Sequence, residues 1–110
     1  MSFVPDAGDL IWLTFDPQAG HEQAGRRPAL VLSPKSYNQR SSLALVCPVT
    51  NQIKGYPFEV QVPAGSGVTG AILADHVKSL DWKARQAARI GRVPSGVVNE
   101  VLARLSPLLG

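Results

Sequence analysis

The sequence predicts a mainly β (α+β) domain, in which a small barrel or strongly bent sheet is covered by one C-terminal helix. Short apolar runs separated by Gly- and Pro-containing segments recur through residues 9–93, which is typical of an all-β arrangement. From residue 97 the apolar spacing changes to steps of three and four, which indicates an amphipathic helix. A chain of 110 residues with 45% hydrophobic residues can bury one core, so we expect a single domain over residues 1–110.

The expected elements can be placed in order along the chain. Strands are predicted where β-favouring or alternating residues recur, at 9–16, 28–33, 43–49, 57–62, 71–74, 76–80 and 88–93. Loops or turns are predicted at 17–27, 50–56 and 63–70, and a single helical turn at 81–86.

Three prolines set expected boundaries. Pro28 should begin its strand, where the missing N–H is least harmful. Pro94 and Ser95 should begin the last helix, and Pro107 should end or kink it. Three residues are expected to pack in the core: Trp12, Cys47 and Trp82.

Composition narrows the function classes. No run of roughly 20 uncharged apolar residues is present, so no membrane span is expected. No signal peptide is visible, and a single cysteine cannot form an internal disulfide, so we expect a cytoplasmic protein. The net charge is +3, and residues 76–110 carry six Lys/Arg against two Asp/Glu. This bias suits an anionic partner and equally suits a solvated basic surface.

No cofactor or metal is expected. Two histidines and one cysteine are too few and too scattered for a zinc site, and the sequence has no HExxH, phosphate-loop or dinucleotide motif. It also lacks the nucleophile elbow of a serine hydrolase. Any catalysis should therefore use a few polar side chains.

The densest polar cluster is residues 21–28, His-Glu-Gln-Ala-Gly-Arg-Arg-Pro. Arg27 precedes a proline, which favours an extended backbone and a well-fixed side chain at a strand start. A guanidinium there suits the charge on a pentacoordinate phosphorus. Arg26 and Arg27 would equally serve to solvate the strand end and pair with Glu22, and the pattern leaves both interpretations open.

Two further sites are open in the same way. Thr50 ends an apolar run, and its hydroxyl suits either a phosphate contact or an ordinary turn. Asp75 and His76 suit either an acid–base pair or a solvent-facing pair at a sheet edge. Trp82 suits the core better than a base-stacking platform.

Ten short blocks, spread over nearly the whole chain, resemble the MazF/PemK family of toxins. They are residues 8–12, 15–17, 20–23, 25–28, 31–33, 47–50, 54–60, 73–75, 77–79 and 99–106. The resemblance implies an SH3-like barrel of the CcdB/PemK type that forms a homodimer. It also implies a metal-independent endoribonuclease that cuts single-stranded mRNA at short motifs, as the toxin of a type II toxin–antitoxin pair. A MazE-type antitoxin would place an acidic segment in the RNA groove.

The resemblance also implies roles for particular residues. The family's catalytic arginine and threonine match Arg27 and Thr50, and its loop glutamate matches Glu22. The PemK branch adds a histidine, matched by His21, and an Arg-x-Asp pair. Asp75 matches that aspartate, whereas Leu73 stands in place of the arginine.

The resulting hypothesis is attack by the RNA 2′-hydroxyl on the adjacent phosphorus. Glu22, His21 or Asp75 is the candidate base, Arg27 stabilises the phosphorane, and Thr50 orients a non-bridging oxygen. Products would carry 2′,3′-cyclic phosphate and 5′-hydroxyl ends. The residues expected to contact substrate are Gln23, Arg26, Asn51, Gln52, Lys54, Tyr56, Asp75, Lys78 and Arg85.

Two alternatives remain at this point. A CcdB-like toxin would bind gyrase without catalysis, and an SH3-like module would bind RNA or peptide without forming product. The Arg27/Thr50 pair and the loop at residues 20–23 favour the ribonuclease.

Overall fold

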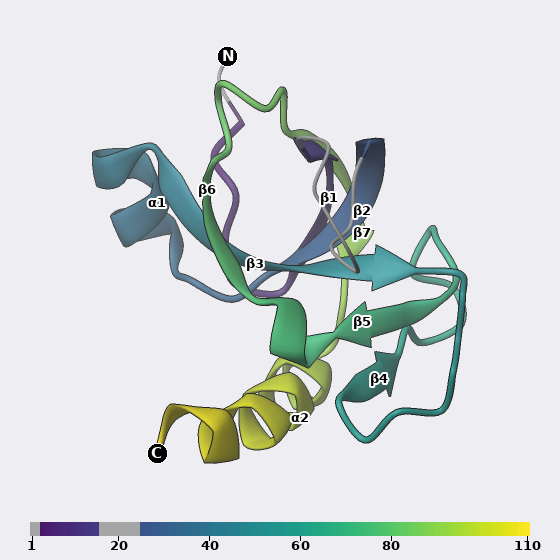
Figure 1. Ribbon diagram of the computed structural model, residues 1–110. Coiled ribbons are helices and arrows are strands. Elements are labelled where there is room, and N and C mark those ends of the chain that lie inside the picture. Colours follow the sequence, from purple (N-terminus) through teal and green to yellow (C-terminus); the bar gives the residue numbers. More distant parts are fainter. Residues whose placement is uncertain (1–2, 16–24) are drawn as a thin grey trace.

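The computed structural model describes residues 3–15 and 25–110, and strands dominate this part of the chain (Figure 1). The described strands are β1 (Asp9–Phe15), β2 (Gly25–Val31), β3 (Leu43–Thr50), β4 (Glu59–Gln61), β5 (Ala71–Leu73), β6 (Lys78–Asp81) and β7 (Ala88–Arg92). The described helices are α1 (Lys35–Ser41), the 3-10 turn η1 (Ala74–His76), α2 (Ser95–Leu105) and the 3-10 turn η2 (Ser106–Leu109).

Strand β3 is central because its two halves pair with different neighbours. The described strands run in the order β4-β5-β3-β2-β1-β7, and β6 also pairs with β3. Residues 43–46 of β3 pair with β6, whereas Val49 and Thr50 pair with β5. Pro48 lies between these two pairings, where its missing N–H interrupts neither ladder. β3 thus passes from the curled part of the sheet into a smaller part formed with β5 and β4.

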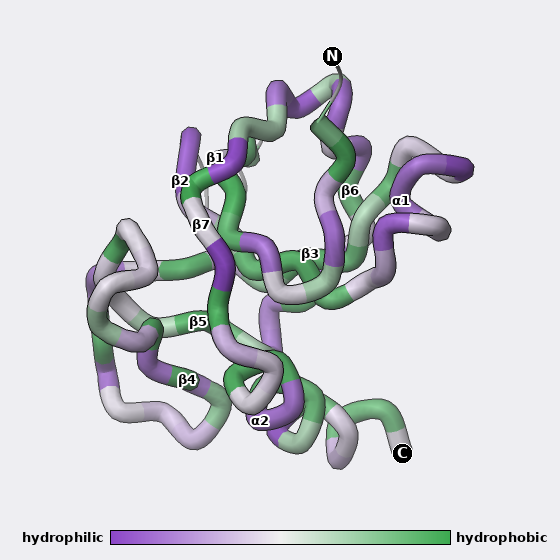
Figure 2. Tube along the Cα trace, turned by 180° about the vertical axis from the view of Figure 1, so that it is seen from behind, coloured by the Kyte–Doolittle hydropathy of each residue, from purple (hydrophilic) through white to green (hydrophobic). Residues whose placement is uncertain are grey.

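Most of β1 and β3 and the second half of β2 are buried on both faces, which explains the apolar runs in these segments. One face encloses the barrel core and the other faces the C-terminal helix. The barrel core consists of Ile11, Leu13, Phe15, Ala29, Val31, Ala44, Val46 and Trp82. The helix-side core consists of Leu10, Leu30, Cys47, Val49, Val60, Val62, Ile72, Ala74, Val93 and Val101. Figure 2 shows α1 as a mainly hydrophilic segment near β3 and β6.

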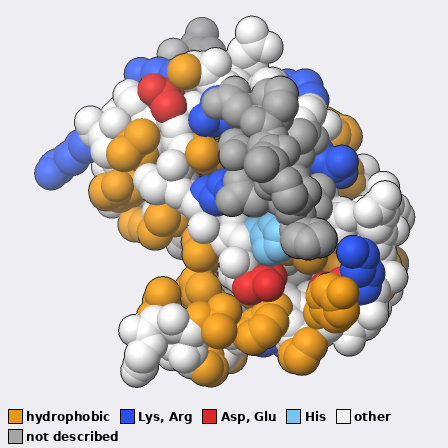
Figure 3. Space-filling model, viewed as in Figure 1, with side chains coloured by type: hydrophobic (Ala, Val, Ile, Leu, Met, Phe, Trp, Pro, Cys, Tyr) orange, Lys and Arg blue, Asp and Glu red, His pale blue; other side chains and the backbone are white. Residues whose placement is uncertain are grey.

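Helix α2 covers the sheet with one stripe, as its apolar spacing predicts. Val101 and Leu105 are buried, and Val97 and Val98 pack partly against the helix-side core. The helix ends at Leu105, and Pro107 falls in η2. Exposed apolar side chains remain at Leu102, Leu108 and Leu109. Figure 3 shows hydrophobic side chains gathered in this lower part of the molecule.

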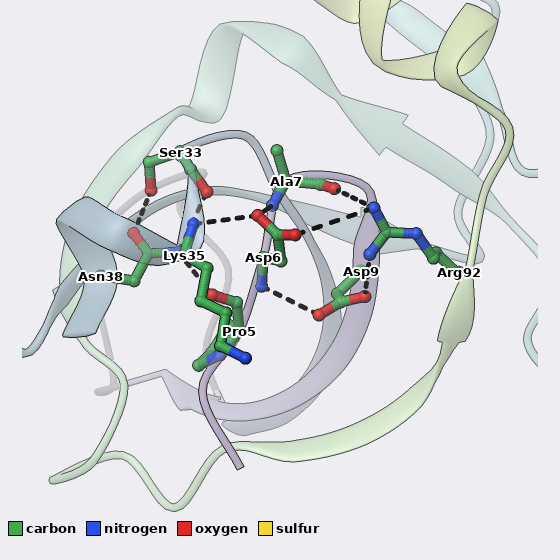
Figure 4. Close-up of polar contacts among 8 residues, drawn as sticks. All are labelled: Pro5, Asp6, Ala7, Asp9, Ser33, Lys35, Asn38 and Arg92. Atoms are coloured by element: carbon green, nitrogen blue, oxygen red, sulfur yellow. Dashed lines mark hydrogen bonds and ion pairs between the residues drawn. The ribbon is translucent and has the colours of Figure 1, made fainter.

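A polar network holds the N-terminal segment against α1 and β7 (Figure 4). Asp9 forms a 2.8 Å ion pair with Arg92 and accepts a hydrogen bond from the Asp6 backbone N–H. The Asp6 carboxylate accepts a hydrogen bond from the N–H of Lys35, the first residue of α1. Asn38 is fully buried and donates to the carbonyls of Pro5 and Ser33.

Several sequence expectations need correction. Residues 25–27 belong to β2 rather than to a loop, while residues 17–24 of the expected loop and residue 16 of the expected first strand lie outside the described residues. Pro28 therefore lies within β2, where it is opposite Trp12 of β1. The pairing of β2 with β3 begins only at the next residue, Ala29. Residues 82–86 form hydrogen-bonded turns, and the Arg85 N–H donates to the Asp81 carbonyl at 3.1 Å, which agrees with the single helical turn expected at 81–86. His76 belongs to η1 rather than to a strand.

Trp12 is 38% exposed and not in the core, because it lies past Leu10 on the helix-side face, beyond the apolar covering. Trp82 and Cys47 are buried, as expected. Helix α1 was not predicted, because its sequence KSYNQRS has no apolar stripe. It is instead held by the buried Asn38.

Candidate active site

Arg27 and Thr50 occupy corresponding positions on neighbouring strands. The β2–β3 ladder pairs Val31 with Val46 and Ala29 with Pro48. The pairing ends at Ala29 and Pro48, so Arg27 and Thr50 each lie two residues beyond its last rung and, by alternation, return to the face of that rung. Opposed residues of an antiparallel pair point to the same face of a sheet, so both side chains belong to one face. The two candidate catalytic residues, 23 positions apart in the sequence, therefore lie toward the same end of the neighbouring strands β2 and β3.

That face is the one that encloses the barrel core. Arg27 is opposite Leu13 on β1, and Leu13 is a barrel-core residue. Lys78 is opposite Val46, another barrel-core residue, so it shares this face from β6. Arg27 and Lys78 are half-buried, and both make interactions within the protein. By strand alternation, Arg27, Lys78 and Thr50 thus belong to the sheet face that carries the barrel core.

Thr50 is held firmly. Its side chain is 5% exposed, and its Oγ1 accepts a hydrogen bond from the Gln52 N–H at 3.1 Å. Gly70 packs directly on its backbone, because a Cβ added there would lie 2.4 Å from the Thr50 carbonyl oxygen. The φ of Gly70 is +128°, which only glycine adopts readily. The sequence showed a Gly-rich turn here but not its contact with Thr50.

Arg26 and Arg85 both donate hydrogen bonds to Thr14, near the end of β1. Arg26 donates to Thr14 Oγ1 and, at 2.7 Å, to the Gln86 carbonyl. Arg85 donates to the Thr14 carbonyl at 3.1 Å. The fold thus gives both arginines a structural use beside the substrate contacts expected from the sequence.

The loop that follows Thr50 carries four of the expected substrate contacts, Asn51, Gln52, Lys54 and Tyr56, and all four are exposed. The Lys54 Nζ lies 5.9 Å from the centre of the Tyr56 ring. The Glu59 carboxylate accepts hydrogen bonds from the N–H groups of Lys54 and Gly55. This role of Glu59 was not predicted, although the alternation of residues 57–62 did set Glu59 on the polar face.

Asp75 lies in η1, between β5 and β6, and its side chain is exposed. The buried thiol of Cys47 is affected by Asp75. Burial, and secondarily the charge of Asp75, raise the pKa of Cys47 from 9.0 to about 12. Leu73, which replaces the arginine of the PemK branch, is a buried strand residue at 8% exposure. This position contributes to the core rather than to a charged pair.

His21, Glu22 and Gln23 lie outside the described residues. Their segment joins β1 to β2 next to the rung that pairs Phe15 with Gly25, two residues from Arg27. The face of the molecule seen in Figure 3 displays Lys and Arg, acidic and histidine side chains. Within residues 3–15 and 25–110, no group of three His, Cys, Asp or Glu side chains is arranged to hold a metal ion.

The fold and these residues define a class of protein: a small, open, helix-covered barrel with Arg27, Lys78 and Thr50 on the core face of its sheet. Known proteins then specify the family. Residues 6–109 match the model of the PemK-like, MazF-like toxin of type II toxin–antitoxin systems. The endoribonuclease toxin MazF of Escherichia coli (strain K12) is 50% identical over 108 residues, covering 98% of this chain and 96% of that protein.

Solved structures agree with this assignment. A crystal structure of MazF (Form-I) from Deinococcus radiodurans superposes with a TM-score of 0.95 at 58% identity, covering 99% of both chains. A MazE–MazF crystal structure (Form-II) from the same organism matches with a TM-score of 0.88 at 51% identity, covering 99% of this chain and 98% of that one. The chain belongs to the PemK-like, MazF-like toxin family. The family, enzyme class and fold class predicted from the sequence are thereby confirmed.

Proposed function

We propose that this protein is the toxin of a type II toxin–antitoxin pair and cuts single-stranded RNA without a metal ion. The observation that supports the proposal is the β2–β3 register, because Arg27 and Thr50 lie on these neighbouring strands, each two residues beyond the rung that pairs Ala29 with Pro48. Family membership supports the activity, since the MazF of Escherichia coli is an endoribonuclease toxin.

The 2′-hydroxyl of the substrate attacks the adjacent phosphorus, and the 5′-oxygen leaves. The new bond joins O2′ to phosphorus, and the P–O5′ bond breaks, which gives a 2′,3′-cyclic phosphate and a 5′-hydroxyl. Arg27 donates N–H groups to the equatorial oxygens, where negative charge accumulates in the phosphorane. The Thr50 hydroxyl oxygen accepts the Gln52 N–H, and its O–H donates to a non-bridging oxygen of the phosphate.

A base removes the proton of the 2′-hydroxyl. The candidates remain Glu22, His21 and Asp75, as in the sequence analysis. Asp75 is the one within the described residues, and it is exposed on η1. The base and the proton donor to the leaving 5′-oxygen are distinguished by the pH–rate profile of each single variant.

The RNA substrate is unpaired, because a duplex hides the base edges and holds the backbone away from in-line geometry. Gln23, Asn51, Gln52 and Tyr56 contact bases, while Arg26, Lys54, Lys78 and Arg85 attract the phosphate backbone. Binding should therefore weaken as salt increases.

The proposal includes two protein partners. A second copy completes a homodimer, as the family resemblance implies, and an acidic segment of a MazE-type antitoxin occupies the RNA site. The MazE–MazF structure from Deinococcus radiodurans supports the antitoxin, since its toxin is 51% identical to this chain. No helix in the described ranges is long and apolar enough to cross a membrane. We also propose a cytoplasmic location, where the mRNA substrate is found.

The test is to incubate the purified protein with mixed-sequence RNA in EDTA and to map both new ends. Cleavage with cyclic-phosphate and 5′-hydroxyl ends is the expected result. An oligonucleotide with a single deoxyribose on the 5′ side of the cut bond should resist cleavage, because it lacks the nucleophile. Cutting of that bond in the deoxy-substituted oligonucleotide would contradict the mechanism.

A further inference from the structure

Glu59 holds the loop at residues 51–58 from the adjoining strand β4. One carboxylate oxygen accepts the Lys54 N–H at 3.0 Å and the other accepts the Gly55 N–H at 2.9 Å. The Glu59 N–H in turn donates to the Tyr56 carbonyl at 3.1 Å. Hydrogen bonds to an ionised carboxylate are stronger than neutral ones, so this arrangement fixes the turn at Gly55, whose φ is +77°.

A second contact anchors the same loop to α2. The guanidinium of Arg104 donates to the Pro57 carbonyl, and it also forms a 3.0 Å ion pair with Glu100 one helical turn earlier. The loop is thus tied at one point to the sheet and at another to the C-terminal helix. Its residues 51–57 are nevertheless exposed, so their side chains are available to a ligand.

What the tied loop presents is an aromatic ring with a cation above it. Tyr56 is 59% exposed, and the Lys54 Nζ lies 5.9 Å from its ring centre. An exposed ring stacks on an unpaired base, and a nearby ammonium attracts the adjoining phosphate. The loop starts directly after Thr50, the last residue of β3. Lys54 and Tyr56 therefore closely follow, in the sequence, the residue proposed to contact the cleaved phosphate.

We infer that Glu59 is a positioning residue: it preforms loop 51–58 so that Lys54 and Tyr56 meet an RNA nucleotide beside the cut. This inference rests on the proposed function. Glu59 itself need not touch RNA, because its carboxylate is occupied by the loop backbone. A loop that is ordered before binding avoids the entropy of being ordered by the substrate. Losing Glu59 should therefore weaken RNA binding far more than it slows the chemical step.

The experiment compares Glu59→Ala with Gln61→Ala. Gln61 is exposed, lies on the same strand and, two residues on, shares the face of Glu59, so it is a matched control. For Glu59→Ala we expect KM for a cleavable single-stranded RNA to rise about 10-fold while kcat stays within about threefold. Glu59→Gln, which keeps one acceptor oxygen, should lie between Ala and wild type.

Hydrogen exchange of the free protein provides a readout that needs no RNA. In Glu59→Ala, protection of the Lys54 and Gly55 amides should fall about 10-fold or more, while the amides of β3 stay protected. Unchanged exchange at both amides, or a loss confined to kcat, would overturn the positioning role. If Glu59→Ala does not fold, Glu59→Gln undergoes both tests. A wild-type protein that cuts no RNA would instead overturn the proposed function, with the exchange result still deciding whether Glu59 orders the loop.

Discussion

Arg26 is bound across the β1–β2 ladder to Thr14, its opposite residue, with its Nη1 3.1 Å from the Thr14 Oγ1. The same guanidinium reaches the Gln86 carbonyl at 2.7 Å. Successive side chains of a strand point to opposite faces, so Arg27 points away from these contacts of Arg26 and belongs to the face of the barrel core. The two adjacent arginines, equivalent in the sequence, therefore have different surroundings. This difference is in keeping with the proposal that Arg27, rather than Arg26, contacts the reacting phosphate.

Replacing Arg27 with alanine should lower kcat by roughly 100- to 1000-fold, because one donor to the charged transition state is lost. The circular dichroism spectrum should stay that of the wild type. Arg89→Ala, an exposed cation on β7, is the control for loss of positive charge. Equal rates for wild type and Arg27→Ala would remove Arg27 from the mechanism.

Thr50→Val should lower kcat by roughly 100-fold, because the shape is kept and the hydroxyl donor is lost. Thr50→Ser should keep most of the activity. The Val variant also removes the acceptor of the Gln52 N–H, and since Gln52 is exposed, water can replace it. Single-turnover cleavage with saturating protein measures the chemical step. Similar rates for the Val and Ser variants would show that the hydroxyl is not used.

Gly70→Ala should destabilise the fold by about 3 kcal/mol or more, since it combines a disallowed φ with a backbone clash. The added Cβ would lie 2.4 Å from the Thr50 carbonyl oxygen, so the active-site strand must shift and kcat should fall as well. Gly65→Ala is the matched control: its φ is +84°, with open space around it, and about 1 kcal/mol is expected. Urea unfolding and RNA cleavage measure the two effects.

Asn38→Ala should lower the free energy of unfolding by about 2–4 kcal/mol, because the carbonyls of Pro5 and Ser33 would remain buried without their hydrogen-bond donor. The cleavage rate per folded molecule should be unchanged, since this network lies outside the proposed site. Gln39→Ala, the exposed neighbour, should change stability by less than about 0.5 kcal/mol. A similar urea midpoint for the two variants would contradict the role of Asn38.

Cys47 should make the fold sensitive to alkali. Its pKa is raised to about 12 in the folded protein from an ordinary value of 9.0, so the thiol stays protonated while the unfolded chain loses its proton. This stabilisation is complete below pH 9.0 and is lost as the pH rises toward about 12. Stability should fall by at most about 1.4 kcal/mol per pH unit in this window.

The measurement for Cys47 is urea unfolding on either side of pH 9.0, for wild type and Cys47→Ala. The Ala variant is less stable at neutral pH because of the cavity, but its stability should fall less steeply with pH. Native protein should also resist alkylation that unfolded protein undergoes, because only the thiolate reacts. Parallel pH slopes for the two proteins would refute the assignment.

The sequence by itself determined the elements that depend on local pattern. Apolar runs specified β1 and β3, the three- and four-residue spacing specified α2, and Pro107 set its end, because these signals act within a few neighbouring residues. The resemblance of spaced motifs identified the family and named Arg27 and Thr50. Helix α1 was missed because a buried amide holds it rather than an apolar stripe.

Only the tertiary structure decided which side chains meet. The β2–β3 register pairs Ala29 with Pro48, Gly70 packs on Thr50, and Glu59 binds the loop at residues 51–58. Trp12, an apolar residue, is partly exposed because the covering of its face ends before it. Such relationships depend on strand pairing between distant segments, and a shift of one residue would turn every side chain to the other face. No local pattern in the sequence encodes that choice.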